Sequence, residues 1–397
     1  MIHGHRSNEQ MTGFNPQVFQ WARESAGLRL EDAARAVHIV PATLGAIERG
    51  EKEPSRTNLA SMAKAYHRSL LTLYLATPPK KGDRGEDFRT VTADRTVKAE
   101  ADIDALVRDL RARQSLVRAV LEAEDDVQHL GFIGSATMQQ GAAAVCRSIE
   151  IGLGITRQDL RAQIDAEQAF SLLRQQAERM GVFVLLIGNL GSHHSAIPVE
   201  AFRGFAISDN VAPFVVINDG DAKAAWSFTL LHELAHLWLG FTGVSGGTPD
   251  RQIERFCNDV AGHFLLPVQE LASVDVAGLD VDAQIAVITE HADRWRVSRL
   301  MVAYSLYKAG RIAQDVWREL DSELRARWSA ERRREKDRRT GITGGPSYYV
   351  VRRHRLGGAI LDLAHRAMDA GTLSPAKAAK VLGVKLRSVY PLLSTVA

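Results

Sequence analysis

The segment from residue 221 to 239 most constrains the fold, because it is helical in pattern and apolar on nearly every side. A helix of this kind belongs in a core, and Gly240 ends it. Its polar face consists of His232, Glu233 and His236, and such a face is costly in a core unless it serves a purpose. The surrounding apolar residues are Phe228, Leu230, Leu231, Leu234, Leu237 and Trp238.

The spacing of the two histidines indicates a metal site. Four residues apart on a helix, His232 and His236 lie within about 40° of each other, so both imidazoles can reach one metal ion. Imidazole suits zinc, which lowers the pKa of a bound water molecule to about 7. Glu233 is turned too far to bind the same ion, but it can take a proton from that water as it attacks a carbonyl. We therefore predict two zinc ligands and a catalytic base.

A third ligand is expected on the next helix, which starts near residue 252 and offers Glu254, Asp259 and His263. Asp259 is turned about 140° from Glu254 and His263 about 180°, which argues against both. Asn258 shares the face of Glu254 and can orient a histidine. We predict Glu254 as the ligand and Asn258 as its support. The alternative is a chance pattern on a buried helix, since only three positions are fixed.

The chain of 397 residues is too long for one ordinary core. Three short β-rich segments predict a small sheet, and helical patterns dominate elsewhere. The expected fold class is α+β. We place the strands at 181–189, 202–208 and 212–219, and the domains at 1–80 (helical), 81–325 (helices with the sheet) and 326–397 (a basic linker and helices). The segments rich in Pro, Gly and charge at 78–87 and in Gly at 341–347 suggest the boundaries.

Composition excludes several classes. Two cysteines, Cys146 and Cys257, cannot form a disulfide framework or an all-cysteine zinc site, and they fit a reducing cytosol. The N-terminus has no signal-like apolar run, and the most apolar stretch, 182–188, is too short to span a membrane. We expect a cytoplasmic protein. A formal charge of +3 gives no whole-chain argument for nucleic acid.

Two motifs resemble those of the ImmA/IrrE family of metallopeptidases. They read HELAHLWLG and IERFCNDVAGHFLLP, and the second matches the family pattern at Glu254, Asn258 and Leu265-Leu266-Pro267. Cys257 and Val260 depart from the usual alanine and phenylalanine, in positions that concern packing.

The resemblance spans roughly residues 90–300 and implies a thermolysin-like, mostly helical domain with a small sheet beside the HExxH helix. It also implies an endopeptidase that cleaves a partner repressor or antitoxin. In it His232, His236 and Glu254 would bind zinc, and Glu233 would be the base. The strand at 212–219 would then be the edge that pairs with an extended substrate.

Residues 14–76 read as five short helices and resemble an XRE-type helix-turn-helix domain, in the stretch LEDAARAVHIVPATLGAIERGEKEPS. The combined architecture resembles proteins coded beside toxins. This leaves an alternative function, a non-proteolytic antitoxin or transcriptional regulator that binds a toxin such as a PIN-type ribonuclease, with a vestigial or structural zinc site. An intact Glu233 favours the enzyme, because a structural site needs no base.

The expected recognition helix is poorly equipped to read DNA. Of its exposed N-terminal positions only Thr43 is polar, and residues 1–76 carry nine Lys/Arg against seven Asp/Glu. We expect weak or indirect DNA contact at most, with docking to a protein equally open. Thr43, Arg49 and Lys52 are the candidate contacts.

The tail LSPAKAAKVLGVKLRSVYPLL is also helix-turn-helix-like. Ser374 can cap one helix, Gly383-Val384 can turn, and a second helix would point Lys385, Arg387 and Ser388 outward. A packed helical hairpin is the commoner explanation. The basic run at 332–339 reads as a solvated helix or linker.

Three weaker candidates remain. His193-His194 could polarise a substrate carbonyl, although a surface turn is the commoner role. Tyr348-Tyr349 could act as a catalytic hydrogen-bond donor, although aromatic packing is the commoner role. Cys257 lies one turn past Glu254, but most single buried cysteines are core residues.

Overall fold

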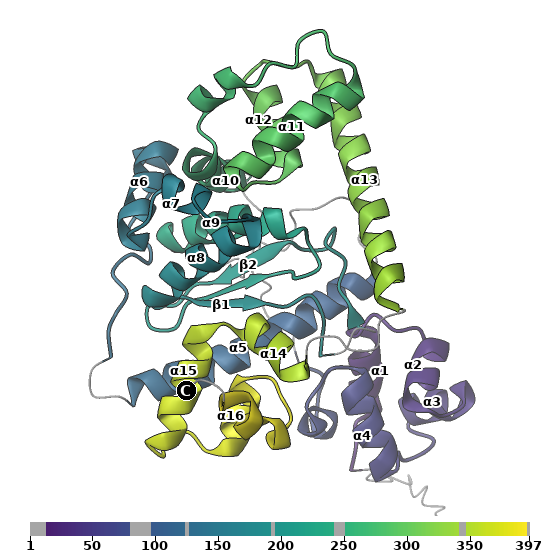
Figure 1. The fold of residues 1–397 in the computed structure, drawn as a ribbon. Helices are drawn as coiled ribbons and strands as arrows, with labels where there is room; N and C mark the ends of the chain where they lie inside the picture. The colour runs from purple at the N-terminus through teal and green to yellow at the C-terminus, as the bar shows by residue number, and fades with distance from the viewer. Residues whose placement is uncertain are drawn as a thin grey trace, which may run out of the picture.

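A computed structural model describes residues 13–79, 97–123, 127–191, 195–241, 251–340 and 347–394 (Figure 1). The chain is mostly helical with one three-stranded sheet, which confirms the α+β class. The segments expected to mark domain boundaries fall mostly outside the described residues, so the domain limits remain a prediction.

The N-terminal part consists of five short helices, as expected, the last of them a 3-10 helix. They are α1 (Pro16–Glu24), α2 (Leu30–Val37), α3 (Pro41–Glu48), α4 (Arg56–Ala65) and η1 (Leu70–Tyr74). Asn15 and Ser55 cap α1 and α4 through side-chain oxygens. The Arg23 Nε atom lies 2.7 Å from Glu48 Oε1, and this largely buried ion pair ties α1 to the end of α3.

The sheet has the order β1-β3-β2, from strands β1 (Phe183–Leu186), β2 (Gly204–Ile207) and β3 (Phe214–Ile217). β1 is parallel to β3, and β2 is antiparallel to it. The prediction that residues 212–219 form an edge strand is wrong. The short turn after β2 brings β3 back antiparallel beside β2. The longer connection after β1 allows β1 to pair with the opposite side of β3, so β3 is the central strand. β1 and β2 are the edges.

Alternating side chains give the sheet two buried faces, which explains why its strands are apolar at nearly every position. One face packs under α8 (Ala166–Arg179) and α9 (Lys223–Trp238), and the other on α5 (Val97–Glu122) and the C-terminal helices (Figure 1). The first face carries Val184, Leu186, Ala206, Val215 and Ile217. The second carries Phe183, Leu185, Phe205, Ile207, Phe214 and Val216.

The core beneath α8 and α9 extends into the helices before and after the sheet. These are α6 (Ala142–Leu153), α7 (Arg157–Arg161), α10 (Arg251–Leu265), η5 (Val268–Ser273), α11 (Val281–Trp295), α12 (Arg299–Lys308) and α13 (Gln314–Thr340), and the short η3 (Met138–Gln140) precedes α6. The basic run at 332–339 lies in the last two turns of α13 and is therefore helical.

The C-terminal helices share the second core with α5 and the sheet. They are α14 (Tyr348–Leu356), α15 (Gly358–Asp369), α16 (Pro375–Val381), η6 (Leu386–Ser388) and α17 (Val389–Leu393). Among the described residues, no helix has both the length and the apolar character that a membrane crossing requires.

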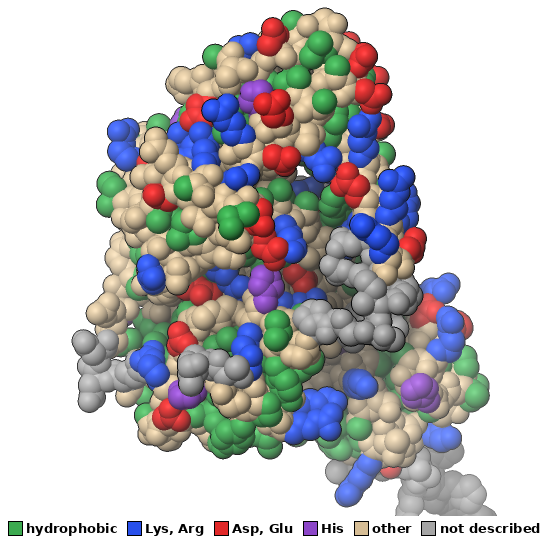
Figure 2. Space-filling view, in the orientation of Figure 1, with side chains coloured by type: hydrophobic (Ala, Val, Ile, Leu, Met, Phe, Trp, Pro, Cys, Tyr) green, Lys and Arg blue, Asp and Glu red, His purple; other side chains and the backbone are tan. Residues whose placement is uncertain are grey.

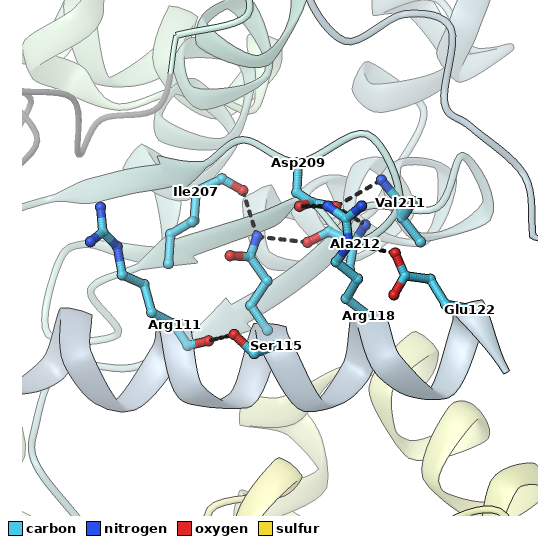
Figure 3. Close-up of polar contacts among 9 residues, drawn as sticks. Arg111, Ser115, Arg118, Glu122, Ile207, Asp209, Val211 and Ala212 are labelled. Atoms are coloured by element: carbon cyan, nitrogen blue, oxygen red, sulfur yellow. Dashed lines mark hydrogen bonds and ion pairs between the residues drawn. The ribbon is translucent and has the colours of Figure 1, made fainter.

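Polar side chains of α5 hold the turn between β2 and β3 (Figure 3). Gln114 Nε2 donates to the carbonyl oxygens of Ile207 at 3.1 Å and Ala212 at 2.8 Å. Arg118 pairs with Asp209 in the same turn. The end of edge strand β2 is thereby fastened to the long helix that crosses below the sheet.

A buried arginine joins the C-terminal helices to the rest of the molecule. The Arg174 guanidinium of α8 pairs with Glu178 at 3.1 Å and donates to carbonyl oxygens of Val184 in β1 and, at 2.6 Å, of His354 in α14. Glu178 in turn accepts the backbone N–H of Gly358 at 3.0 Å. One ion pair thus connects α8, β1, α14 and α15.

Replacing Arg174 by alanine should lower the free energy of unfolding by about 3–5 kcal/mol, because Glu178 and several carbonyl groups would stay buried without their partner. Urea denaturation measures the loss. Arg179→Ala, an exposed position on the same helix, is the matched control and should change stability by less than about 0.5 kcal/mol. Equal losses in both variants would contradict the role given to Arg174.

Candidate metal centre

Helix α9 places two histidines in the interior. It packs against α8, α10 and strand β2, and most of its residues are buried. Side-chain exposure is 2% for His236 and 12% for His232. Two imidazoles so far from solvent need polar partners.

Helix α10 supplies that partner. Along α9 it brings the Glu254 carboxylate, 13% exposed, to both imidazoles. The Nε2 atoms of His232 and His236 are 3.1 Å apart. Glu254 Oε2 lies 3.4 Å from His232 Nε2, and Glu254 Oε1 lies 3.4 Å from His236 Nε2.

These distances suit a metal ion. Ligands about 2.0–2.1 Å from a tetrahedral ion lie roughly 3.3–3.4 Å from one another, close to the separations observed. One ligand atom from each of the three residues lies within 4.8 Å of the others. Two imidazoles and one carboxylate leave one tetrahedral position open, as in catalytic rather than structural sites.

The electrostatics also fit. Burial lowers the pKa of His232, against the raising effect of the Glu254 carboxylate. The imidazole is therefore neutral at pH 7, the form that offers a lone pair to a metal. The arrangement of His232, His236 and Glu254 matches the ligand set that the sequence predicts.

The three clustered residues lie in a segment that matches a known protein family. Residues 178–307, from the end of α8 through α12, match the model of the IrrE N-terminal-like domain, a peptidase family. This segment is similar to that family and is called the IrrE-like domain below. Residues 19–73 match a helix-turn-helix model, so both suspected resemblances are confirmed. Members of the IrrE-like peptidase family are typically metallopeptidases. Searches of curated proteins and of solved structures return no match.

The remaining polar residues of α10 lie as the helix angles predict. Burial lowers the pKa of His232, and the exposed Asn258 side chain has a smaller opposing effect on it, so Asn258 lies near this imidazole. Asp259 and His263 are exposed, and His263 Nδ1 lies 2.8 Å from the carbonyl oxygen of Asp259. Cys257 is fully buried in the core of the IrrE-like domain and is not among the three clustered residues.

Gly204, at the start of β2, is a site residue that the sequence reasoning missed. A Cβ atom there would lie 2.4 Å from Thr229 Cγ2 and 3.1 Å from Glu233 Oε1, so only glycine lets α9 press the Glu233 carboxylate against the strand. Glu233 is 3% exposed. An isolated glycine inside a predicted strand signals such a close approach and was available as a clue.

The other candidates lie away from the metal centre or outside the described residues. Tyr349 packs in the second core, across the sheet from α9, and stacks edge-on with the exposed Tyr348 at 5.3 Å. This is the packing role expected. His193-His194 lie outside the described residues.

In the helix-turn-helix domain, Thr43 is half-buried and Lys52 is exposed. Arg49 pairs with Glu51 through hydrogen bonds of 2.7 and 2.8 Å, so a carboxylate stands beside its charge. Val40, just before α3, is 63% exposed. The exposed start of α3 is therefore largely apolar, as the sequence indicates.

Gly204→Ala should lower the free energy of unfolding by about 1–3 kcal/mol through overpacking against α9. Thr229→Ser removes the closest clashing atom, so the double variant should recover much of the loss. A double-mutant cycle in urea measures this coupling. Additive losses would show that the two residues do not compete for the same space.

Proposed function

We propose that this protein is a zinc-dependent endopeptidase that cleaves a specific protein partner, such as a repressor or antitoxin. The observation that carries the proposal is the cluster of His232, His236 and Glu254 inside the IrrE-like domain. Two imidazoles and a carboxylate are a ligand set characteristic of catalytic zinc. The helix-turn-helix domain on the same chain favours a regulatory role.

In this proposal His232, His236 and Glu254 hold the ion, and Asn258, which lies near His232, helps to orient that imidazole. When bound, zinc supplies a Lewis acid that polarises water and the substrate carbonyl. Glu233 takes the proton of the attacking water and later returns it to the leaving amine. Gly204 keeps the Glu233 carboxylate between α9 and the edge of the sheet.

The substrate is proposed to bind as an extended segment along β2. Among the described residues, β3 is paired on both sides, whereas β2 pairs with β3 only. Asn218 donates to Arg203 at 2.8 Å, so in this register the N–H and C=O of Gly204 point away from β3. Gly204 is also the residue that touches Glu233, which would bring the paired chain to the catalytic base.

A second candidate is a binding protein that neutralises a toxin such as a PIN-type ribonuclease without cutting it. The largely apolar, exposed start of α3 favours it, because such a surface suits a protein better than base edges. In that case the metal site would be structural or vestigial, and Thr43 and Lys52 would be partner contacts. DNA contact by this domain would be weak, since Arg49 is engaged by Glu51.

Glu233→Gln distinguishes the two candidates. Wild type and variant are each analysed for zinc and incubated with the protein coded by the neighbouring gene. We expect equal zinc content, and cleavage slowed by about 10²–10⁴-fold in the variant, because the base is removed while the ligands stay. Neutralisation of an uncut partner, equally by both proteins, would refute the peptidase and support the binding protein.

Asn258→Ala tests the metal centre independently of activity. Loss of the Asn258 side chain near His232 should weaken zinc binding by about 10–100-fold, measured by competition with a chelating dye. Asp259→Ala, its exposed neighbour on α10, should leave zinc affinity unchanged. Equal affinity in both variants would remove Asn258 from the site.

A further inference from the structure

Near the C-terminus, α16, the turn at Gly383, η6 and α17 form a helix-turn-helix-like arrangement that neither family match covers. Ser374 caps α16 through its hydroxyl, Gly383 makes the turn at φ 58°, and η6 leads directly into α17. α16 contacts both η6 and α17. Pro391 falls in the first turn of α17, where its missing N–H costs nothing.

The second helix of this motif has one buried and one exposed face. Val389, Leu392 and Leu393 enter the core shared with α5 and the sheet. Leu386 and Tyr390 are 55% and 62% exposed. Lys385 and Arg387 are exposed as expected, but the prediction that Ser388 points outward is wrong, because it is 8% exposed and turns toward the core side of the helix.

The motif is strongly basic. Residues 370–397 contain four cations and no Asp or Glu, whereas residues 13–79 carry eight Lys/Arg against six Asp/Glu. Lys377 and Lys380 lie exposed on α16, and Lys385 and Arg387 lie on the turn and η6. In the lower middle of the molecule, where Figure 1 places α14 and α16, basic and hydrophobic side chains lie side by side (Figure 2).

The turn of this motif is held rigidly. Arg352 Nη2 donates to the carbonyl oxygens of Leu382 at 2.9 Å and Gly383 at 2.8 Å. Gly383 has a φ of 58°, and a Cβ atom there would lie 2.2 Å from the buried Arg113 guanidinium of α5, so a larger residue would be strained and would displace Arg113. Rigid support of this kind presents the exposed face in one fixed orientation.

We propose that α16, η6 and α17 form a binding site for duplex DNA. Lys377, Lys380, Lys385 and Arg387 contact phosphates, and the exposed Leu386 and Tyr390 at the start of the second helix reach the major groove. Apolar side chains there can contact thymine methyl groups, and the tyrosine hydroxyl can reach a phosphate or a base. This site is independent of the proposed peptidase activity.

The test uses the full-length protein and a labelled mixed-sequence DNA duplex, with affinity followed by fluorescence anisotropy between about 50 and 200 mM salt. Lys385→Ala/Arg387→Ala should weaken binding at least about tenfold at the lower salt. It should also reduce the slope of log affinity against log salt by about 2, since each phosphate contact contributes about 0.9.

The matched control is Arg294→Ala/Arg318→Ala, which removes the same charge from exposed positions on α11 and α13, at the opposite end of the molecule (Figure 1). It should leave the affinity and the salt slope close to wild type. Each pair is also tested in an Arg49→Ala/Lys52→Ala background, so that the N-terminal domain cannot hide the effect. Wild-type protein without affinity for the duplex, or equal behaviour of the two pairs, would overturn the proposal and leave the surface to a protein partner.

Discussion

The packing of α10 against α9 is the contact on which the candidate site depends. It brings one carboxylate to two imidazoles in a place where all three are largely removed from water. Burial keeps His232 neutral, and the carboxylate supplies the compensating charge for a cation. The separations of 3.1–3.4 Å between these groups are close to those of ligands around one ion, so the three side chains are already placed as a metal site would require.

The rest of the molecule keeps that contact in place through the sheet. One face of the sheet lies under α9, and the other rests on α5 and the C-terminal helices, so flanking segments from both sides of the IrrE-like domain complete its core. Gln114 fastens the β2–β3 turn, and Arg174 links α8 to β1 and α14. The position of β2 against Glu233 therefore depends on residues far from the IrrE-like segment.

A helix-turn-helix domain precedes the IrrE-like segment, and the short helices α16, η6 and α17 follow it. The N-terminal domain exposes Val40 and pairs Arg49 with Glu51, whereas α16, η6 and α17 expose basic residues in a segment that contains no Asp or Glu. The physical contrast suggests a division of labour, with a protein partner at the first and nucleic acid at the second. Such an arrangement would suit a regulator whose peptidase acts on a partner held near DNA.

The sequence alone determined the features that depend on local spacing. Helical periodicity placed the two histidines on one face, argued against Asp259 and His263 by angle, and located the five N-terminal helices. Short β-rich segments located the three strands. Strand order, the free edge at β2, the approach of Glu233 to Gly204 and the core shared with the C-terminal helices were decided only by tertiary structure. The physical reason is that these features join segments far apart in the chain. Local patterns show that residues 212–219 form a strand, but which strands flank it depends on how the connections pack.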